Sequence, residues 1–295
     1  MANLKEIRSR ISSVSSTMQI TQAMKMVSAA KLKRAQDAIT QMRPYANKLK
    51  ELLSNLSDST EDTQSGVYLE EREVIKSVLI VAITSNRGLA GAFNANVIKK
   101  TTQLIEEYSG KSVTVVTIGK AAKDHFRKTE FIIKGTALPR NMEVIYDDLT
   151  FDNVAAYAQK FMDSFAYKQF DKVELVYNRF VNAATQIVQV EQFLPLLPEK
   201  DENTTDKSHV KYIFEPSKEY IITELIPKSI KIQLYKAILD SHAAEHGARM
   251  TAMHKATDNA TELLGELKLA YNKARQASIT NEILEIVGGA EALNS

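Results

Sequence analysis

The first 56 residues carry apolar side chains at alternating intervals of three and four positions. Sixteen positions follow this spacing and thirteen of them are apolar, namely Leu4, Ile7, Ile11, Val14, Met18, Leu32, Ala35, Ile39, Met42, Ala46, Leu49, Leu53 and Leu56. An alternation held over this many turns is typical of a coiled-coil seam. The pattern predicts that residues 1–57 form one long helix that needs a partner. Pro44 is expected to kink this helix, because proline removes a backbone donor.

A second long helix is predicted at the other end of the chain, within residues 209–295. No proline occurs from Lys228 to Ser295, and an apolar stripe there comprises Met250, Met253, Ala260, Leu264, Leu267, Tyr271, Ala274, Ile279, Ile283 and Ile286. The simplest arrangement pairs this helix with residues 1–57 as an antiparallel coiled coil. If Leu4 lies opposite Tyr271, Lys25 lies near Met250. The last ~24 residues then form a single-helix tip about 36 Å long, whose isoleucines need an apolar collar from another protein.

Three consecutive positions of the N-terminal seam are polar, namely Thr21, Lys25 and Ser28. A polar residue in a seam commonly sets the register of the two helices. Three together indicate either that this face turns toward another partner or that the supercoil loosens locally. We favour the second interpretation for packing, with the contact made by the small residues Ala23, Ala29 and Ala30. Lys25 itself remains a candidate for an outside contact.

The central residues 67–208 follow a different pattern, in which Val- and Ile-rich runs alternate with helical segments. Strands are expected at 77–84, 112–118, 131–134, 172–180 and 186–193, and helices at 94–108, 120–127 and 153–167. Strands separated by helices indicate parallel pairing in a layered domain. The predicted fold class is therefore α/β: a central Rossmann-like domain together with a long antiparallel two-helix coiled coil formed by both termini.

The composition excludes several classes of protein. The 295-residue chain has no cysteine, so it has no disulfide scaffold, thiolate metal site or cysteine nucleophile. No apolar run approaches the roughly 18 residues that cross a bilayer, and no signal peptide is recognisable, so an intracellular protein is expected. Residues 1–50 hold ten Lys or Arg against two acids, which should attract an acidic surface or a polyanion. A basic coiled-coil protein that binds nucleic acid is therefore the chief alternative function.

Two motifs suggest chemistry but are better explained by structure. The turn Thr84–Asn94 contains Gly88 and Gly91 between a strand and a helix, where a phosphate could bind, yet it is neither a P-loop nor GxGxxG. Two glycines that allow a tight turn are the favoured explanation. The segment His242–His246 matches the H-x-x-E-H zinc pattern, but a long helix offers neither a third ligand nor a pocket. With no acid, base or nucleophile gathered at the turn, a nucleotide-using enzyme is a weaker alternative, and we expect no catalytic residue, metal or cofactor.

Three segments resemble one known family. Residues Arg10–Gln36 resemble the N-terminal helix of the ATP synthase gamma subunit family, and Ser85–Asn94 is similar to its Ser-x-Arg-Gly-Leu-x-Gly-x-x-Asn loop. The strongest match joins Ser241–Ala260 to Tyr271–Ala290, and it contains the family signature Ile279, Thr280, Glu282, Glu285, Gly289 and Ala290. Ala90 and Ala92 replace a Cys and a Gly common in relatives, and no cysteine-bearing regulatory insert is present.

The resemblance implies a central rotor shaft without catalytic residues. Its partners would be three alpha and three beta subunits, the epsilon subunit and a membrane ring of c subunits driven by ion flow, with no nucleic acid. The chain would be a peripheral protein on the cytoplasmic face of the inner membrane, and it would carry torque between that ring and the catalytic sites.

The resemblance also implies which residues contact the partners. Arg275, Gln276 and Thr280 are expected to form hydrogen bonds to beta-subunit loops, and Glu282 is expected at the same contact with the alpha/beta head. Met24 and Lys25 should face an acidic beta loop, although Lys25 replaces an acid found in some relatives. The remaining residues that it assigns belong to a structural turn: Arg87, Gly88 and Gly91.

Overall fold

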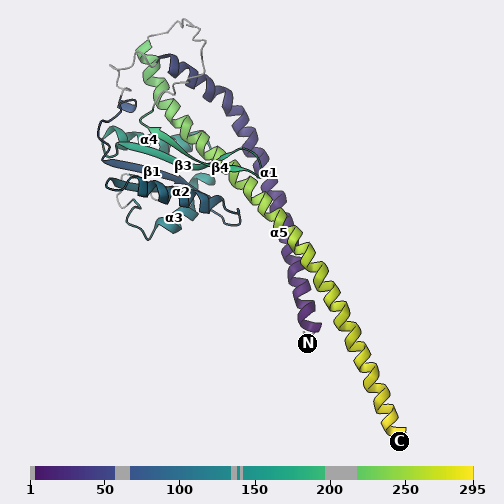
Figure 1. The fold of residues 1–295 in the computed structure, drawn as a ribbon. Coiled ribbons are helices and arrows are strands. Elements are labelled where there is room, and N and C mark those ends of the chain that lie inside the picture. Colours follow the sequence, from purple (N-terminus) through teal and green to yellow (C-terminus); the bar gives the residue numbers. More distant parts are fainter. Residues whose placement is uncertain (1–3, 57–66, 134–137, 140–141, 197–217, 295) are drawn as a thin grey trace. The chain divides into compact units, whose positions relative to one another are not determined.

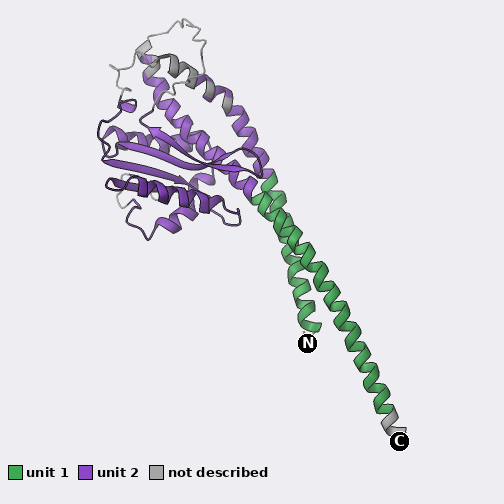
Figure 2. Cartoon of the chain, viewed as in Figure 1, with its two compact units in different colours: residues 1–29, 249–295 green, residues 30–248 purple. Residues whose placement is uncertain are grey.

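The structure, a computed structural model, describes the chain except residues 1–3, 57–66, 134–137, 140–141, 197–217 and 295 (Figure 1). The chain forms two compact units, which are described separately below (Figure 2). Unit 1 comprises residues 1–29 and 249–295, and unit 2 comprises residues 30–248. Helix α1 (Leu4–Leu56) and helix α5 (Lys218–Asn294) each contribute to both units. The division of the chain at 1–57, 67–208 and 209–295 stays a prediction.

Unit 2 is built around a four-stranded sheet in the order β2-β1-β3-β4. The strands are β1 (Ser77–Ile83), β2 (Ser112–Ile118), β3 (Lys172–Phe180) and β4 (Gln186–Leu194). The central strand β1 pairs in parallel with β2 and β3, as the alternation of strands and helices predicted. Strand β4 is antiparallel to β3, because the short connection between them allows a hairpin but no crossover. The strand expected at 131–134 is reduced to a single bridge between Val115 and Ile132.

Both faces of the sheet are covered by helices, which are α2 (Phe93–Glu107), α3 (Lys120–Phe126), α4 (Phe151–Ala166) and part of α5 (Figure 1). Alternate residues of β1 point to opposite faces. Val78 and Ile80 pack with α2 and α3, whereas Leu79 and Val81 pack with α4 and with the α5 residues around Ile230. A short 3-10 helix, η3 (Glu143–Tyr146), precedes α4.

Helix α5 begins earlier than the sequence suggested. It starts at Lys218 and continues through Pro227, whereas the proline-free segment starts at Lys228. Ile226 and Ile230 flank this proline and are fully or almost fully buried in the core of unit 2. Their burial offsets the missing hydrogen bond at the proline, since tertiary packing supplies most of the stability of protein helices. Helix α1 likewise continues through Pro44.

Unit 1 is an antiparallel pair formed by the first part of α1 and the last part of α5. Its helices are joined by Arg8 Nη2 donating to the hydroxyl of Tyr271 at 2.7 Å and by a 2.8 Å hydrogen bond between the hydroxyls of Thr21 and Thr257. These contacts set Leu4 opposite residues near 275, which is about one helical turn beyond the predicted partner Tyr271. The repeat fixes which face of each helix is buried but not how far one helix slides along the other.

The polar part of the seam remains in the interface, contrary to the expectation of a loosened supercoil. Thr21 and Ser28 are 8% and 2% exposed, whereas Ala23 and Ala30 are exposed and Ala29 is half-buried. The three alanines therefore do not replace the polar seam residues. Burial of Thr21 costs little free energy because its hydroxyl bonds both Thr257 and the carbonyl of Met18.

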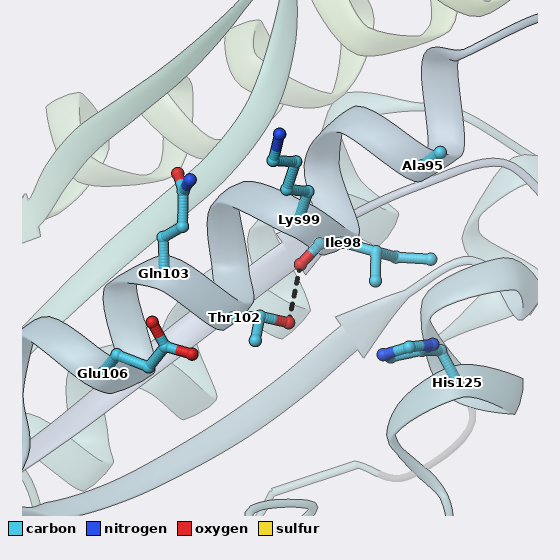
Figure 3. A pocket seen from close by; sticks show the side chains of 7 residues that line it. All are labelled: Ala95, Ile98, Lys99, Thr102, Gln103, Glu106 and His125. Atoms are coloured by element: carbon cyan, nitrogen blue, oxygen red, sulfur yellow. Dashed lines mark hydrogen bonds between the residues drawn. The ribbon is translucent and has the colours of Figure 1, made fainter.

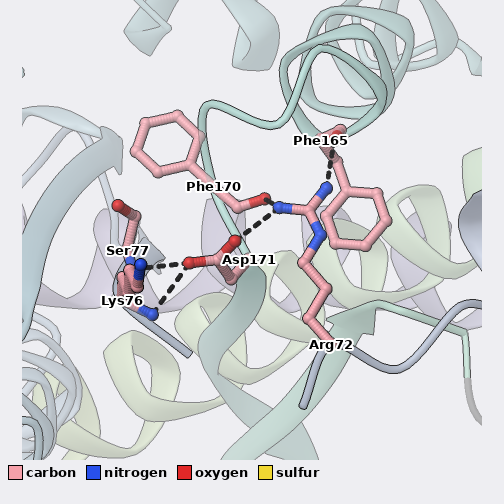
Figure 4. Close-up of polar contacts among 6 residues, drawn as sticks. All are labelled: Arg72, Lys76, Ser77, Phe165, Phe170 and Asp171. Atoms are coloured by element: carbon pink, nitrogen blue, oxygen red, sulfur yellow. Dashed lines mark hydrogen bonds and ion pairs between the residues drawn. The ribbon is translucent and has the colours of Figure 1, made fainter. Parts of the chain in front are cut away.

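A partly buried ion pair ties the segment before β1 to the start of β3 (Figure 4). The guanidinium of Arg72 lies 2.6 Å from a carboxylate oxygen of Asp171 and also donates to the carbonyls of Phe165 and Phe170. The other carboxylate oxygen of Asp171 accepts from the backbone amides at positions 76 and 77, each at 2.8 Å. Burial by itself would raise the pKa of Asp171, but these donors together hold the pKa below its ordinary value.

We expect Asp171→Asn to lower the free energy of unfolding of the chain by about 2 kcal/mol at neutral pH, because it removes the charge that pairs with the partly buried Arg72 guanidinium. The depressed pKa means that this contribution is complete above the unfolded-state pKa and is lost as the pH falls through the folded-state value. Urea unfolding at pH 7 and in acid measures both effects. Asp124→Asn, at an exposed position of α3, is the control. An equal effect of the two substitutions at pH 7 would contradict the assignment.

Candidate functional site

The last turns of α5 extend past the start of α1 in unit 1 (Figure 2). Three isoleucines there are exposed, with Ile279 at 48%, Ile283 at 55% and Ile286 at 71%. None of the three packs on α1, which agrees with the prediction of a single-helix tip. With the observed register, the tip starts near residue 275 and is about 30 Å long, one turn shorter than expected.

The exposed isoleucines do not continue the coiled-coil seam. The seam positions Tyr271 and Ala274 are half-buried, and the next position in that rhythm is Ser278, which is half-buried as well. The isoleucine stripe starts one residue later, and one residue rotates the side chain by about 100° around the helix. The spacing along the sequence predicts one continuous stripe for both sets of positions. The isoleucines instead form a separate apolar face that looks away from α1.

The C-terminal residues assigned by the resemblance lie beside this apolar face. On a helix that turns by about 100° per residue, seven side chains fall within an arc of about 160° around the helix axis. In order around this arc they are Glu282, Arg275, the three isoleucines, Gln276 and Thr280. All four polar side chains are exposed. Thus the isoleucines have a charged edge on one side, whereas on the other side the amide of Gln276 and the hydroxyl of Thr280 flank the exposed Val287. We name this surface, residues 275, 276, 279, 280, 282, 283 and 286, the tip face.

The polar groups of the tip face are available to a partner. The Thr280 hydroxyl donates to the backbone carbonyl of Gln276 at 2.9 Å, which leaves its oxygen able to accept a bond. Glu282 accepts a weak 3.5 Å bond from Ser278. Within the part of the chain that the structure describes, no ion pair or hydrogen bond engages the side chains of Arg275 and Gln276.

Met24 and Lys25 form a separate surface on α1. Both side chains are half-buried, and the Lys25 ammonium pairs with no carboxylate of the described residues. In the observed register Lys25 lies opposite residues near 253, so about 33 Å of helix separates it from Arg275. The structure therefore does not bring the predicted N-terminal and C-terminal contact residues together.

The turn after β1 in unit 2 is closed by its own hydrogen bonds. The Ser85 amide donates to Asn94 Oδ1 at 3.0 Å, Asn94 Nδ2 donates to the Ser85 hydroxyl at 2.9 Å, and that hydroxyl donates to the Arg87 carbonyl at 2.6 Å. Gly91 has a φ of +57°, a left-handed backbone conformation that glycine adopts without steric cost, which explains why a glycine stands at this position. Gly88 has no such φ, and the second left-handed residue is Leu89 instead. The expectation that both glycines serve backbone geometry is thus met only at Gly91.

The carboxyl end of the parallel strands, where ligands of α/β folds usually bind, is covered by α5. Ala90 and Phe93 from the turn form a buried cluster with Ala244 of α5, and Phe180 and Ala248 pack against it. With this edge filled by the chain's own helix, and with the turn amide of Ser85 bonded internally, we find no support for a nucleotide site there.

The two histidines of the H-x-x-E-H motif contact each other in unit 2, where their Nε2 atoms lie 3.1 Å apart. His246 is buried, and the ring of Tyr146 stacks on His242 at 5.9 Å. Burial, and to a smaller degree the charge of Glu245, raises the pKa of Tyr146, whose hydroxyl donates to the Thr84 carbonyl at 2.9 Å. No group of three potential ligands among the described residues could hold a metal ion. The contacts indicate that this motif fixes α5 to unit 2.

A groove of about 580 Å³, which was not predicted from the sequence, runs between α2 and α3 (Figure 3). It is lined by Ala95, Ile98, Lys99, Thr102, Gln103, Glu106 and His125. The α2 residues that line the groove recur at helical spacing on the outer face of an amphipathic helix. This spacing is the one feature of the sequence that could have indicated the groove. The Thr102 hydroxyl is bonded to the carbonyl of Ile98 at 3.0 Å, and the lining holds no base and nucleophile in contact. We assign it no chemistry.

No helix among the described residues is long and apolar enough to span a membrane. Comparison with known proteins gives one consistent result. Residues 3–293 match the family model described as ATP synthase. The ATP synthase gamma chain of Flavobacterium johnsoniae is 64% identical over the whole of both chains, and that of Cytophaga hutchinsonii is 52% identical over the same coverage.

Two solved structures have a similar fold. A chain of the Euglena gracilis mitochondrial ATP synthase (OSCP/F1/c-ring, rotational state 3) aligns with a TM-score of 0.63 at 21% identity, covering 98% of this chain and 94% of that chain. A chain of the Tetrahymena thermophila mitochondrial ATP synthase central stalk and c-ring aligns with a TM-score of 0.56 at 24% identity, covering 80% of this chain and 99% of that chain.

Proposed function

The chain belongs to the ATP synthase gamma chain family, and from this premise we propose how its two units serve a rotor subunit. It is a central-stalk subunit of ATP synthase, with the alpha and beta subunits, the epsilon subunit and the c ring as its partners. It transmits torque between the ion-driven ring and the three catalytic sites of the head. The observation that carries our proposal is the tip face, an exposed apolar stripe with polar edges beyond the coiled coil.

We propose that the tip face lies in an apolar collar of the alpha/beta head. Three isoleucines that are about half exposed or more need a nonpolar environment, and burial of an isoleucine side chain yields about 1.5–3 kcal/mol. Arg275, Gln276 and Thr280 then form hydrogen bonds with beta-subunit loops, and Glu282 lies at the same contact. A bearing of this kind combines an apolar centre that slides with a few polar contacts that change with angle.

The Met24–Lys25 surface is the proposed contact with the acidic beta loop. A shaft without three-fold symmetry inside a three-fold head touches the three catalytic sites differently, so their conformations and affinities differ. Rotation then transfers each set of contacts to the next site. The internal pairing of α1 with α5 in unit 1 supplies the stiffness that a single helix lacks.

Lys25→Glu is expected to weaken this contact without abolishing rotation. An exposed ion pair contributes about 0–1 kcal/mol, so one charge reversal removes only a small part of the interaction. ATP hydrolysis and proton-driven ATP synthesis by the assembled enzyme measure the effect, and each should fall less than about tenfold. Complete loss of both activities in a fully assembled enzyme would contradict this prediction.

We further propose that the subunit has no catalytic residue of its own and acts at the cytoplasmic face of the inner membrane, as a peripheral component of a proton-coupled enzyme. The turn at Arg87, Gly88 and Gly91 then has a structural role. This is consistent with the internal hydrogen bonds of the turn and with the α5 residues that cover the carboxyl edge of the sheet.

Copurification of the tagged chain from its own membranes tests the proposed function. The alpha, beta and epsilon subunits should be recovered in stoichiometric amounts, and the complex should hydrolyse ATP. The alternative, a basic coiled-coil nucleic-acid-binding protein, instead predicts recovery of DNA or RNA that is released by salt. The family membership gives that alternative no support.

A further inference from the structure

One side of α1 in unit 1 is exposed but carries no charge. Eight residues at helical spacing fall within an arc of about 120° and extend over about 27 Å of the helix. They are Ser9, Ser13, Ser16, Thr17, Ile20, Ala23, Met24 and Val27. All of them are exposed except the half-buried Met24, and the large apolar residues Ile20 and Val27 are 60% and 58% exposed. We name these eight residues the uncharged face.

The other side of unit 1 carries the charges expected of a helix that faces water. Five exposed charged residues lie on the side of α5 that points away from α1, namely Lys255, Asp258, Glu262, Glu266 and Lys273. In contrast, the stretch of α1 from Ile11 to Met24 includes no Lys, Arg, Asp or Glu, although the chain as a whole is 25% charged. Arg10 lies just beyond the edge of the uncharged face and is paired with Glu6 at 2.8 Å. The two helices of this unit therefore present different surfaces.

The composition of the uncharged face carries a cost for the helix. Six of the nine residues from Ser9 to Thr17 are Ser or Thr, which form helices less readily than Lys, Glu or Gln. A helix that only faced water would gain stability from those longer side chains and from ion pairs between successive turns. Interfaces between proteins, however, are depleted of charged residues at their centre. The uncharged face is therefore better explained as a surface that another protein covers.

Two hydroxyls of this face already have partners within the helix. Ser16 Oγ donates to the carbonyl of Ser12 at 3.0 Å, and Thr17 Oγ1 donates to the carbonyl of Ser13 at 2.9 Å. Burial of a polar group costs little free energy when it is hydrogen-bonded. These hydroxyls therefore need no fixed hydrogen-bond partner on the surface that covers them.

We infer that the uncharged face lies against an uncharged part of the inner wall of the alpha/beta head while the shaft turns. This inference rests on the proposed rotor function. Two features point to the head as the covering protein. Met24 belongs both to this face and to the proposed contact with the beta loop, and the tip face, the other proposed contact with the head, lies in the same unit.

The absence of charge suits a surface that must pass three equivalent walls. A charged group in a buried contact has to leave water and needs a partner of opposite charge. During rotation such a group would have to exchange its partner at every wall, and each exchange would add a barrier. A face of methyl groups and internally bonded hydroxyls makes similar contacts at each wall. Contacts that change with angle are then left to Lys25 and to the polar edges of the tip face.

Ser16→Lys tests this inference, with Asn259→Lys as the matched control. Both substitutions add one positive charge at an exposed position of unit 1, and lysine favours a helix more than serine or asparagine does. In the observed register the two positions differ by about one helical turn along the shaft. Titration of fluorescently labelled alpha/beta complex with the full chain measures affinity. We expect Ser16→Lys to weaken binding at least about tenfold and Asn259→Lys to weaken it less than about threefold. An equal effect of the two substitutions would overturn the inference.

Further variants separate the added charge from other changes. Ser16→Ala removes the hydroxyl but keeps the face uncharged, so it should bind as the wild-type chain does. A loss of affinity as large as that of Ser16→Lys would show that the hydroxyl makes the contact and would overturn the inference. If thermal unfolding shows that Ser16→Lys does not fold, Ala23→Lys places the same charge on the same face and should give the same loss. Failure of the proposed function has a different signature, because the wild-type chain itself would then not bind the alpha/beta complex.

Discussion

Ile283→Asp should weaken binding of the chain to the alpha/beta head by a factor of roughly 30 or more, while the chain's own stability stays unchanged. Ile283 is 55% exposed and belongs to the tip face, which no described part of α1 covers. A surface substitution of this kind changes the free energy of unfolding by less than about 0.5 kcal/mol. In a buried collar the carboxylate would instead remove an apolar anchor worth about 2 kcal/mol or more, a loss of roughly 30-fold in affinity.

Two control variants separate binding from folding. Ile283→Leu keeps the apolar surface and should bind normally. Ile7→Asp places a charge in the seam of unit 1, where the side chain is 7% exposed, and should lower thermal stability as well as binding. Binding is measured by titration of fluorescently labelled alpha/beta complex, and stability by thermal unfolding of the chain alone. Normal binding by Ile283→Asp would show that the tip face is not buried in the head.

Gly119→Ala is expected to prevent stable folding of unit 2, with a loss of more than about 4 kcal/mol. Gly119 follows β2 with a φ of +102°, and a Cβ atom there would lie 2.1 Å from the carbonyl oxygen of Thr84. That carbonyl accepts a hydrogen bond from Tyr146, and the Thr84 amide donates to Ile118 at 2.7 Å. The end of β1 therefore cannot retreat without breaking its contacts on both sides.

Gly110→Ala is the matched control for this substitution. Its φ is also positive, at +89°, but no atom lies within 4 Å of the added Cβ position. The control therefore carries the backbone strain without the collision and should cost about 1–3 kcal/mol. Urea unfolding of both variants, followed by circular dichroism, gives the difference. Equal stability of the two variants would show that the approach of Thr84 to Gly119 does not restrict residue 119.

The sequence was sufficient to predict those features that depend on periodicity. The three-four alternation identified seam positions such as Ile7 and Leu32, which are buried, and the Val- and Ile-rich runs located the four strands nearly to the residue. The exposed isoleucine tip also followed from pairing two helices of unequal length. These features depend on local spacing, which one sequence contains in full.

The features that the sequence analysis missed depend on contacts between distant residues. The alternation did not distinguish one helical turn of sliding from another, and the hydrogen bond between Thr21 and Thr257 identifies the register. The ion pair of Arg72 with Asp171, and the approach of Ala183 to Gly247, each join residues far apart in the chain. Nothing in the local spacing of such residues indicates that they meet.

Observation of single molecules tests directly whether this chain turns inside the alpha/beta head. Because the chain has no cysteine, Lys128→Cys, at an exposed position in unit 2, supplies a unique attachment point for a probe bead. The head is immobilised on a surface and ATP is added. We predict rotation of the bead in one direction, in three main steps per turn that match the three catalytic sites. A bead that remains static while the same immobilised complexes hydrolyse ATP would contradict it.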